Sequence, residues 1–190
     1  ATRFVWCGRL GTARQTFTRR IYALNDMSSY LFESRSEQDT DRLGATLEAV
    51  LPQRAVIGLQ GTLGAGKTRL VQAIAGAAGI DRKDVTSPTF VLCQEYHGRR
   101  TLYHLDAYRI ADEDEFLELG VDEMFQSDGL VFVEWSDRVA SCLPPAHIEI
   151  LITTSEEGLR QFNIVDKQTE DSSFISALET MLGTDAAGTG

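Results

Sequence analysis

Apolar side chains recur along this chain at two spacings, one typical of helices and the other of strands. Helical spacing begins after Ser36, a residue type that caps helix N-termini, and Asp39 stands where a capping partner is expected. The pattern continues until Pro52, which cannot extend a helix. The apolar positions of this predicted helix are Leu43, Leu47, Val50 and Leu51.

Three further helices are predicted from the same spacing and from residues that start or stop helices. The first follows a glycine-rich segment and ends at Gly79. A short acidic helix is expected between Asp112 and Gly120, and the last one over about 172–182. The apolar face of the helix before Gly79 consists of Leu70, Val71, Ile74 and Ala78.

Short apolar runs bounded by turn residues predict strands between these helices. The run 130–133 is wholly apolar, which is typical of a strand buried on both faces in a parallel sheet. Strands interleaved with helices, without an internal repeat or a dividing linker, predict one α/β domain over residues 27–182. Its central sheet is expected to be mostly parallel and flanked by helices, and residues 183–190 to be a disordered tail. The predicted strands are 55–59, 89–96, 101–106, 130–133, 147–153 and 160–166.

One segment carries a specific chemical pattern, because residues 61–68 fit G-x-x-x-x-G-K-[ST] without exception. They lie between a predicted strand and a predicted helix, the context that a phosphate-binding P-loop requires. Glycines let backbone N–H groups converge on a phosphate, and the helix adds partial positive charge at its N-terminus. Lys67 would reach the β- and γ-phosphates, and the Thr68 hydroxyl would reach Mg²⁺. The loop residues expected to bind nucleotide are Gly61, Leu63, Gly64, Ala65, Gly66, Lys67 and Thr68.

Two predicted strands end in a carboxylate. The run 130–134 ends at Glu134 and has the form of a Walker B strand, while the run 102–106 ends at Asp106. A solvated strand tip is the ordinary interpretation of one such residue. A P-loop, however, needs an acidic partner for its metal and a group that orients the attacking water. Asp106 and Glu134 are therefore predicted, with Lys67, to be the catalytic residues.

The type of nucleotide follows from what the sequence contains and lacks. A GTPase would carry an N-K-x-D guanine reader, which is absent from this chain, so ATP with Mg²⁺ is favoured. A small-molecule kinase would carry arginines in a lid over its second substrate. The corresponding stretch, residues 111–128, is acidic and contains neither Arg nor Lys. Phosphorylation of another anion is therefore disfavoured.

Composition adds information about compartment and partners. Hydrophobic residues make up 43% and charged residues 24% of the chain, as in ordinary globular proteins, and no apolar run is long enough to span a bilayer. The three cysteines are widely separated, which argues against a zinc site or a disulfide framework and suits the cytoplasm. The net charge of −10 should repel nucleic acid, so contact with tRNA is expected only through a partner.

Residues 1–26 differ from the rest of the chain. They hold five arginines and a single acidic residue, and Met27 follows them directly. We interpret them as an upstream segment that is not native or is disordered. An organelle transit peptide and a genuine N-terminal extension are the alternatives.

Several short strings together resemble one family. In order and spacing they are similar to the TsaE family, formerly called YjeE, the ATPase component of bacterial tRNA threonylcarbamoyladenosine synthesis. The resemblance implies a single P-loop NTPase-like domain that acts with the TsaB–TsaD pair to modify the adenosine beside the anticodon. The strings are Gly61–Thr68, Ser87–Phe90, His104–Arg109 and Glu134–Trp135, within a resemblance that extends from about Ser36 to Arg160.

The resemblance also implies roles for individual residues. Thr68 and Glu134 would hold Mg²⁺, and Asp106 would position or activate the hydrolytic water, although the roles of the two acids are interchangeable at this stage. Thr89, in a switch-like loop, would sense the γ-phosphate. Thr62 departs from the acid common in the family, but this position supplies mainly backbone. Two further residues expected near the nucleotide, with a solvated surface role as the alternative, are Glu37 and Arg160.

Other conspicuous residues keep two interpretations. His104 is expected to be a satisfied core histidine rather than an acid–base catalyst, and Trp135 either packs on the sheet or contacts a ligand or partner. Tyr108 and Arg109 either anchor the loop after Asp106, through packing and an ion pair with an acid, or contact a partner. The acidic run 112–118 is read as a solvated helix face, with docking on a basic partner as the alternative.

Three functions are compatible with the sequence. The leading one is an ATPase that hydrolyses slowly alone and faster with its partners, because no arginine finger is evident. The second is a binding module in which ATP stabilises a shape that partners recognise. The third is a small-molecule kinase.

Overall fold

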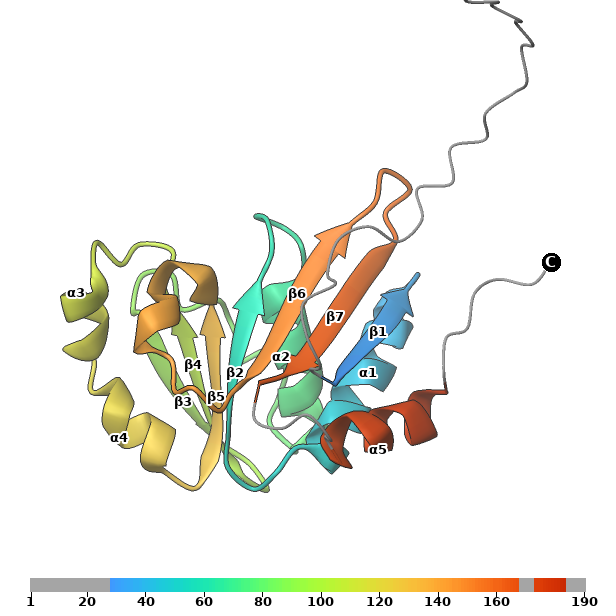
Figure 1. Ribbon diagram of the computed structural model, residues 1–190, viewed down its shortest axis with the longest axis horizontal. Helices are drawn as coiled ribbons and strands as arrows, with labels where there is room; N and C mark the ends of the chain where they lie inside the picture. Colours follow the sequence, from blue (N-terminus) through green and yellow to red (C-terminus); the bar gives the residue numbers. More distant parts are fainter. Residues whose placement is uncertain (1–27, 168–172, 184–190) are drawn as a thin grey trace, which may run out of the picture.

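A seven-stranded sheet forms the middle layer of the molecule, and helices cover both of its faces (Figure 1). The computed structural model describes residues 28–167 and 173–183, so the predictions for residues 1–26 and for the tail after Gly183 lie outside the described residues. The strands are β1 (Ser29–Ser34), β2 (Ala55–Gln60), β3 (Cys93–His97), β4 (Thr101–Asp106), β5 (Gly129–Glu134), β6 (Ile148–Thr154) and β7 (Arg160–Asp166). The helices are α1 (Glu37–Val50), α2 (Lys67–Ala77), α3 (Glu113–Leu117), α4 (Val121–Gln126), the 3-10 helix η1 (Ser136–Cys142) and α5 (Ser173–Leu182).

The strand order β1-β7-β6-β2-β5-β4-β3 puts β2 in the middle of the sheet. β2 pairs in parallel with β5 and β6, and β5 pairs in parallel with β4. The outer pairs, β1 with β7, β7 with β6 and β3 with β4, are antiparallel. The prediction of one α/β domain with a parallel central sheet is confirmed, and the antiparallel edges make the whole sheet mixed.

The central strands are buried on both faces, because each face carries its own apolar core. In β2, Ile57 and Leu59 point into the core beneath α1, α2 and α5, whereas Val56 points into the core beneath α3, α4 and η1. In β5, Phe132 and Val133 divide in the same way. A strand buried on both faces reads as a continuous apolar run, which is why 130–133 was recognisable from the sequence.

Helix α1 begins as its sequence predicts. The Ser36 hydroxyl accepts a hydrogen bond from the Asp39 backbone N–H at 3.1 Å and donates to the Asp39 carboxylate at 2.8 Å. That carboxylate also accepts from the Arg35 backbone N–H at 2.9 Å. The hydrogen bond from Ser36 and the one from the Arg35 backbone are the main reasons why the pKa of Asp39 lies below its ordinary value. Two otherwise unpaired donors at the helix start are thereby satisfied.

Two predictions about strands need correction. β1 was missed because Tyr30, Leu31 and Phe32 are all apolar, whereas their burial alternates and Leu31 stays exposed. The predicted strand 89–96 starts only at Cys93, because Val91 and Leu92 both donate to the Pro88 carbonyl and form a turn. Leu92 has a φ of 64°, which a strand does not allow.

The segment between β4 and β6 contains more helix than predicted. The helix capped by Asp112 is present as α3, but Gly120 leads directly into α4, and η1 follows β5. These elements are too short to show an apolar period, so their sequences gave no signal. Among the described helices, none combines the length and the apolar character needed to cross a membrane.

Candidate functional site

The carboxyl ends of β2, β5 and β4 meet at one edge of the sheet, the upper edge in Figure 1. Glu134 lies opposite Leu59 in the parallel register of β5 and β2, and opposite Asp106 in that of β5 and β4. The glycine-rich loop leaves β2 at the same edge. The sheet therefore brings together the predicted phosphate loop and both predicted carboxylates, at the carboxyl ends of its parallel strands, where ligands of α/β proteins bind.

The loop 61–66 takes backbone conformations that favour glycine. Gly61, Gly64 and Gly66 have φ angles of 140°, 79° and 111°, in the region that other residues rarely adopt. A Cβ atom on Gly61 would lie 2.5 Å from the Ile152 carbonyl oxygen of β6, so side chains other than hydrogen are excluded there. The sheet thus passes directly beneath the start of the loop.

Arg160, at the start of β7, contacts the loop. Its Nε atom donates to the Ala65 carbonyl oxygen at 3.1 Å. Its guanidinium also lies beside Gly66, where an added Cβ atom would be 3.4 Å from Nε. Arg160 therefore links β7 to the loop. It also adds positive charge next to the loop backbone that would face phosphate.

Lys67, the first residue of α2, folds back over the loop. Its Nζ atom donates to the carbonyl oxygens of Gly61 at 2.8 Å and Thr62 at 3.1 Å, and lies 3.7 Å from the ring centre of Trp135. Burial lowers the pKa of Lys67 below its ordinary value, while the charges of Glu134, Asp106 and Asp137 act in the opposite direction. The ammonium group is thus held by carbonyls, an aromatic face and nearby negative charge.

A chain of side-chain hydrogen bonds runs through Glu134. The Thr68 hydroxyl donates to Glu134 Oε1 at 2.7 Å, and His104 Nε2 lies 2.8 Å from the same oxygen. His104 is fully buried, as predicted for a core histidine, but its partner is the site carboxylate. The prediction that its polar atoms are satisfied holds only for Nε2, because Nδ1 has no partner among the described residues.

Asp106 is engaged at both carboxylate oxygens. Oδ2 accepts hydrogen bonds from the hydroxyls of Ser87 and Thr89, each at 2.8 Å, and Oδ1 accepts from the Tyr108 backbone N–H at 2.9 Å. The two hydroxyls also lie 2.8 Å from each other. The structure thus joins the 87–89 loop to the end of β4, which brings the predicted switch-like residue Thr89 to the predicted water-orienting carboxylate.

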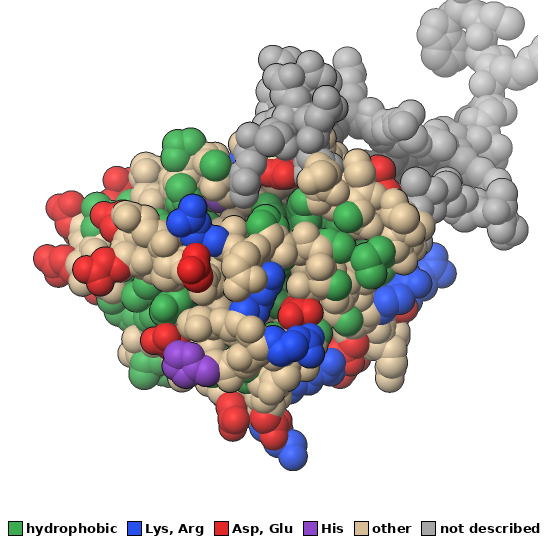
Figure 2. All heavy atoms as spheres, turned by 90° about the horizontal axis from the view of Figure 1, so that it is seen from below, with side chains coloured by type: hydrophobic (Ala, Val, Ile, Leu, Met, Phe, Trp, Pro, Cys, Tyr) green, Lys and Arg blue, Asp and Glu red, His purple; other side chains and the backbone are tan. Residues whose placement is uncertain are grey.

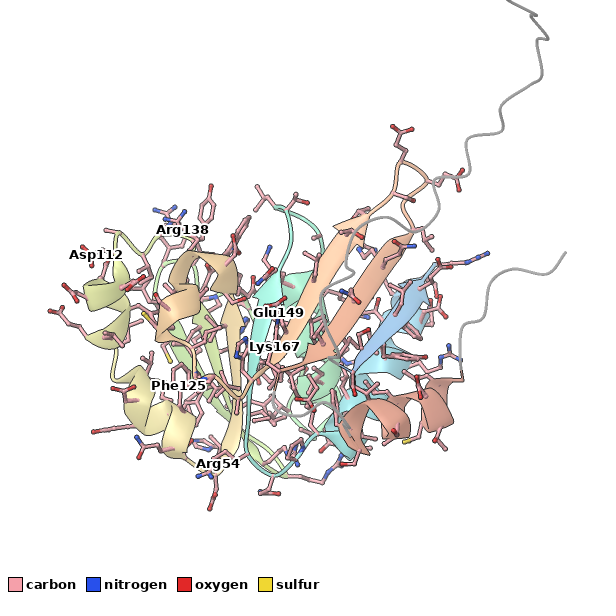
Figure 3. The ribbon with its side chains drawn as sticks, in the orientation of Figure 1. Arg54, Asp112, Phe125, Arg138, Glu149 and Lys167 are labelled. Carbon is pink, nitrogen blue, oxygen red and sulfur yellow. The ribbon has the colours of Figure 1, made fainter. Side chains whose placement is uncertain are left out.

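The loop that follows Asp106 is anchored, but not by the predicted ion pair. Arg138 of η1 donates to the carbonyl oxygens of Ala107 at 3.0 Å and Ile110 at 3.1 Å, and lies beside this loop in Figure 3. In the described part of the chain, Arg109 has no ion pair with the acids of 112–115. Arg138 carried no recognisable motif, so sequence reasoning missed it.

Aromatic residues lie beside the predicted site residues. The ring centres of Tyr108 and Trp135 are 4.9 Å apart, so these two side chains pack against each other. Arg109 lies 4.4 Å from the ring centre of Phe90. Phe90 and Leu63 are each 83% exposed, which is unusual for large apolar side chains.

Glu37 is the one predicted site residue that lies apart from this cluster in its contacts. Its side chain is 78% exposed and pairs with Arg69 of α2 at 3.7 Å. Arg69 also pairs with Asp41 at 2.5 Å, which ties the start of α1 to the first turn of α2. Glu37 thus reaches the site only through α2.

The donor set at the loop fits Mg²⁺. Thr68 Oγ1 and Glu134 Oε1 are hard oxygen donors that lie 2.7 Å apart, so both are within reach of one small cation or of its bound water. The described residues contain no cluster of three or more His, Cys, Asp or Glu side chains that could hold a metal. Mg²⁺ in phosphate sites is bound by one or two protein oxygens together with phosphates and water, so a sparse protein set suits it.

Comparison with known proteins identifies the family. A family model described as Threonylcarbamoyl adenosine biosynthesis protein TsaE matches residues 34–162, which include every predicted site residue. This chain belongs to the TsaE family. The resemblance read from four short strings is therefore confirmed.

Relatives from distant bacteria agree with the TsaE assignment. Proteins named tRNA threonylcarbamoyladenosine biosynthesis protein TsaE are 42% identical in Treponema pallidum, over 69% of this chain and 96% of that protein, and 35% identical in Bacillus subtilis, over 71% and 84%. The crystal structure of Bacillus subtilis YdiB matches with a TM-score of 0.65 and 26% identity, over 84% of this chain and 97% of that one. The TsaE fold therefore extends across the described domain.

Proposed function

We propose that this TsaE protein is a Mg²⁺-dependent ATPase that acts in tRNA threonylcarbamoyladenosine biosynthesis with the TsaB–TsaD pair. The observation that carries the proposal is the convergence of Lys67, Thr68, Glu134 and Asp106 on the edge of the sheet where the P-loop starts α2. The family assignment connects this site with the modification of tRNA.

Different groups of the chain bind the phosphates and the metal ion. Backbone N–H groups of the loop and of the first turn of α2 bind the phosphates, because the first N–H groups of a helix have no partner within it. Lys67 exchanges its bonds to the loop carbonyls for bonds to the β- and γ-phosphates. Thr68 and Glu134 hold Mg²⁺, which neutralises phosphate charge when bound.

The hydrolytic water is assigned to Asp106. Its carboxylate stands at the end of β4 beside Glu134 and is linked to Thr89 through Oδ2. Thr89 would turn from Asp106 to the γ-phosphate, and Oδ2, which still accepts from Ser87, would orient water for attack on the γ-phosphorus in line with the departing ADP. Exchange of hydrogen bonds at one carboxylate thus couples nucleotide state to the 87–89 loop.

Partners and compartment belong to the same proposal. The exposed side chains of Phe90 and Leu63 border the site, where a partner that orders the 87–89 loop would accelerate hydrolysis. The net charge of −10 favours contact with tRNA only through the TsaB–TsaD pair, in the cytoplasm. A concentration of acidic side chains at the end of the molecule that carries α3 and α4 is visible in Figure 2.

The test is phosphate release from Mg-ATP, measured for the chain alone and with the TsaB–TsaD pair. We expect slow release alone and faster release with the pair, and none above background for Lys67→Ala. Turnover of tens of ATP per second by the isolated chain would contradict the proposed dependence on partners. Transfer of labelled phosphate to a metabolite instead of water would favour the kinase alternative.

A further inference from the structure

The hydrogen bond between His104 and Glu134 is not used by the proposed mechanism. His104 Nε2 lies 2.8 Å from Glu134 Oε1, and the His104 side chain is wholly buried. An ionised carboxylate only accepts hydrogen bonds, so Nε2 carries the proton of this bond. His104 is therefore the donor, and it holds the oxygen that also accepts the Thr68 hydroxyl at 2.7 Å.

Packing alone does not explain a histidine at this position of β4. The other ring nitrogen, Nδ1, has no partner within residues 28–167 and 173–183. A buried polar atom without a partner destabilises a fold, so an apolar side chain would suit the core better. The one polar contact of the ring is directed at Glu134.

The register of the sheet explains why the contact is fixed. β4 and β5 are parallel neighbours, with His104 opposite Phe132 and Asp106 opposite Glu134. The Ala107 backbone N–H donates to the Glu134 carbonyl oxygen at 3.0 Å, so the ends of the two strands are joined beside the carboxylate. The ring is thus presented to Glu134 by rigid backbone on both sides.

We propose that His104 is a positioning residue, which holds the Glu134 carboxylate through Nε2–H in the orientation that Mg²⁺ binding requires. The inference rests on the proposed Mg²⁺-dependent nucleotide binding. Residues that orient a metal ligand through such a hydrogen bond contribute about ten- to a hundredfold to metal affinity. With Mg²⁺ bound, a lone pair of the Thr68 hydroxyl oxygen would face the metal, and the bond from His104 would hold Oε1 in place beside it.

The test compares His104→Gln with His104→Leu. The Gln side chain has a reach similar to that of Nε2 and keeps a donor for Glu134, whereas Leu fills the space without one. The readout is the apparent affinity for Mg²⁺, titrated in the presence of a saturating non-hydrolysable ATP analogue, and separately the affinity for the analogue without Mg²⁺. His147→Leu is the control. It replaces a histidine by the same residue, but His147 contacts the Pro144 carbonyl oxygen in the loop before β6 and not Glu134.

We expect His104→Leu to weaken Mg²⁺ affinity about tenfold or more, His104→Gln to stay within a few-fold of the native protein, and Mg²⁺-free binding to be unchanged in both. His104→Asn, whose amide is one methylene too short to reach Oε1, replaces Leu if that variant does not fold. Equal Mg²⁺ affinity in all variants, or equal losses in Gln and Leu, would overturn the inference while the ATPase proposal stands. If the native protein itself binds the analogue equally with and without Mg²⁺, the proposed function fails and the inference fails with it.

Discussion

At the scale of single residues, Gly61 shows most directly how the sequence shapes the site. Its φ of 140° and the Ile152 carbonyl oxygen, 2.5 Å from any added Cβ, exclude other side chains. Gly64 has a φ of 79° with nothing within 4 Å of an added Cβ. A side chain at Gly61 would therefore meet both an unfavourable backbone conformation and a steric clash, whereas one at Gly64 would meet only the unfavourable conformation.

We predict that Gly61→Ala lowers the free energy of unfolding by about 3 kcal/mol or more, through strain and contact together. Gly64→Ala should lower it by about 1–2 kcal/mol, since only the conformation is unfavourable. Urea denaturation of both variants measures the difference. Equal losses would mean that β6 moves away to accommodate the Gly61 variant.

Asp106 is the residue that separates an ATPase from a nucleotide-dependent binding module. We predict that Asp106→Asn slows phosphate release about a hundredfold or more, because a group that handles the attacking water contributes at least that much. Binding of the ATP analogue should change little, since the amide still accepts from the Tyr108 backbone N–H. Asp112→Asn, at the α3 cap, is the control. A variant that supports tRNA modification without hydrolysis would favour the binding module.

Site residues were predictable from the sequence when they belong to a short local motif, and not when their contacts join distant positions of the chain. The residues 61–68 were identifiable because a phosphate requires glycines, lysine and threonine at fixed local spacing. The contact of His104 with Glu134 spans 30 positions, and that of Arg160 with Ala65 spans 95. Such contacts depend on strand order, which residue types alone do not encode; Arg160 was found only through the family resemblance. No local pattern identifies Arg138.

At the scale of elements, the start of α1 makes stability depend on pH. The pKa of Asp39 is lowered, chiefly by the hydrogen bond from Ser36, so its contribution is present above the unfolded pKa of about 3.9. The contribution is lost as pH falls through the lower folded value, because the unfolded state then binds the proton more strongly. We predict that native protein and Asp39→Asn differ in stability at pH 6 and converge as the pH falls below about 4. Urea midpoints at stepped pH measure this, and a constant difference would contradict it.

Helix η1 and the loop after β4 are joined by Arg138, so their stabilities should be coupled. We predict that Arg138→Met lowers the free energy of unfolding by about 1 kcal/mol, because its bonds to the Ala107 and Ile110 carbonyls are lost while the apolar stem is kept. Arg35→Met, which within the described part of the chain removes one exposed ion pair of 3.8 Å with Glu33, should change the free energy of unfolding by less than about 0.5 kcal/mol. Thermal unfolding of both variants provides the comparison, and equal effects would argue against the anchoring role.

Elements were predictable where burial and apolar pattern coincide. β5 is buried at every position, so its continuous apolar run predicted a strand correctly. β1 and η1 were not predicted, each for a different reason. In β1 the exposed position is occupied by Leu31, so the sequence lacks the alternation of apolar and polar residues. Before η1, the chain turns at Trp135, which has a φ of 59°. Neither feature has a local sequence signature.

At the scale of the whole molecule, charge governs association with nucleic acid. A net charge of −10 gives long-range repulsion from tRNA, because binding to phosphate backbones depends on Lys and Arg. We predict no submicromolar complex between this chain and tRNA at about 0.15 M salt. A direct fluorescence titration tests it, with the TsaB–TsaD pair as the positive control. A tight binary complex would show that the chain contacts tRNA itself.

The central position of β2 also affects the order in which the molecule becomes functional during synthesis. Residues up to Glu134 supply the loop, Lys67 and both carboxylates, but Ile152 beneath Gly61 and Arg160 beside Ala65 belong to β6 and β7. One wall of the phosphate loop is therefore missing until these late strands have left the ribosome. A nascent chain that has reached only η1 lacks part of the site, so under the proposed function ATP would favour only the final step of folding. Under the proposed function, affinity for nucleotide would therefore appear only in the finished domain.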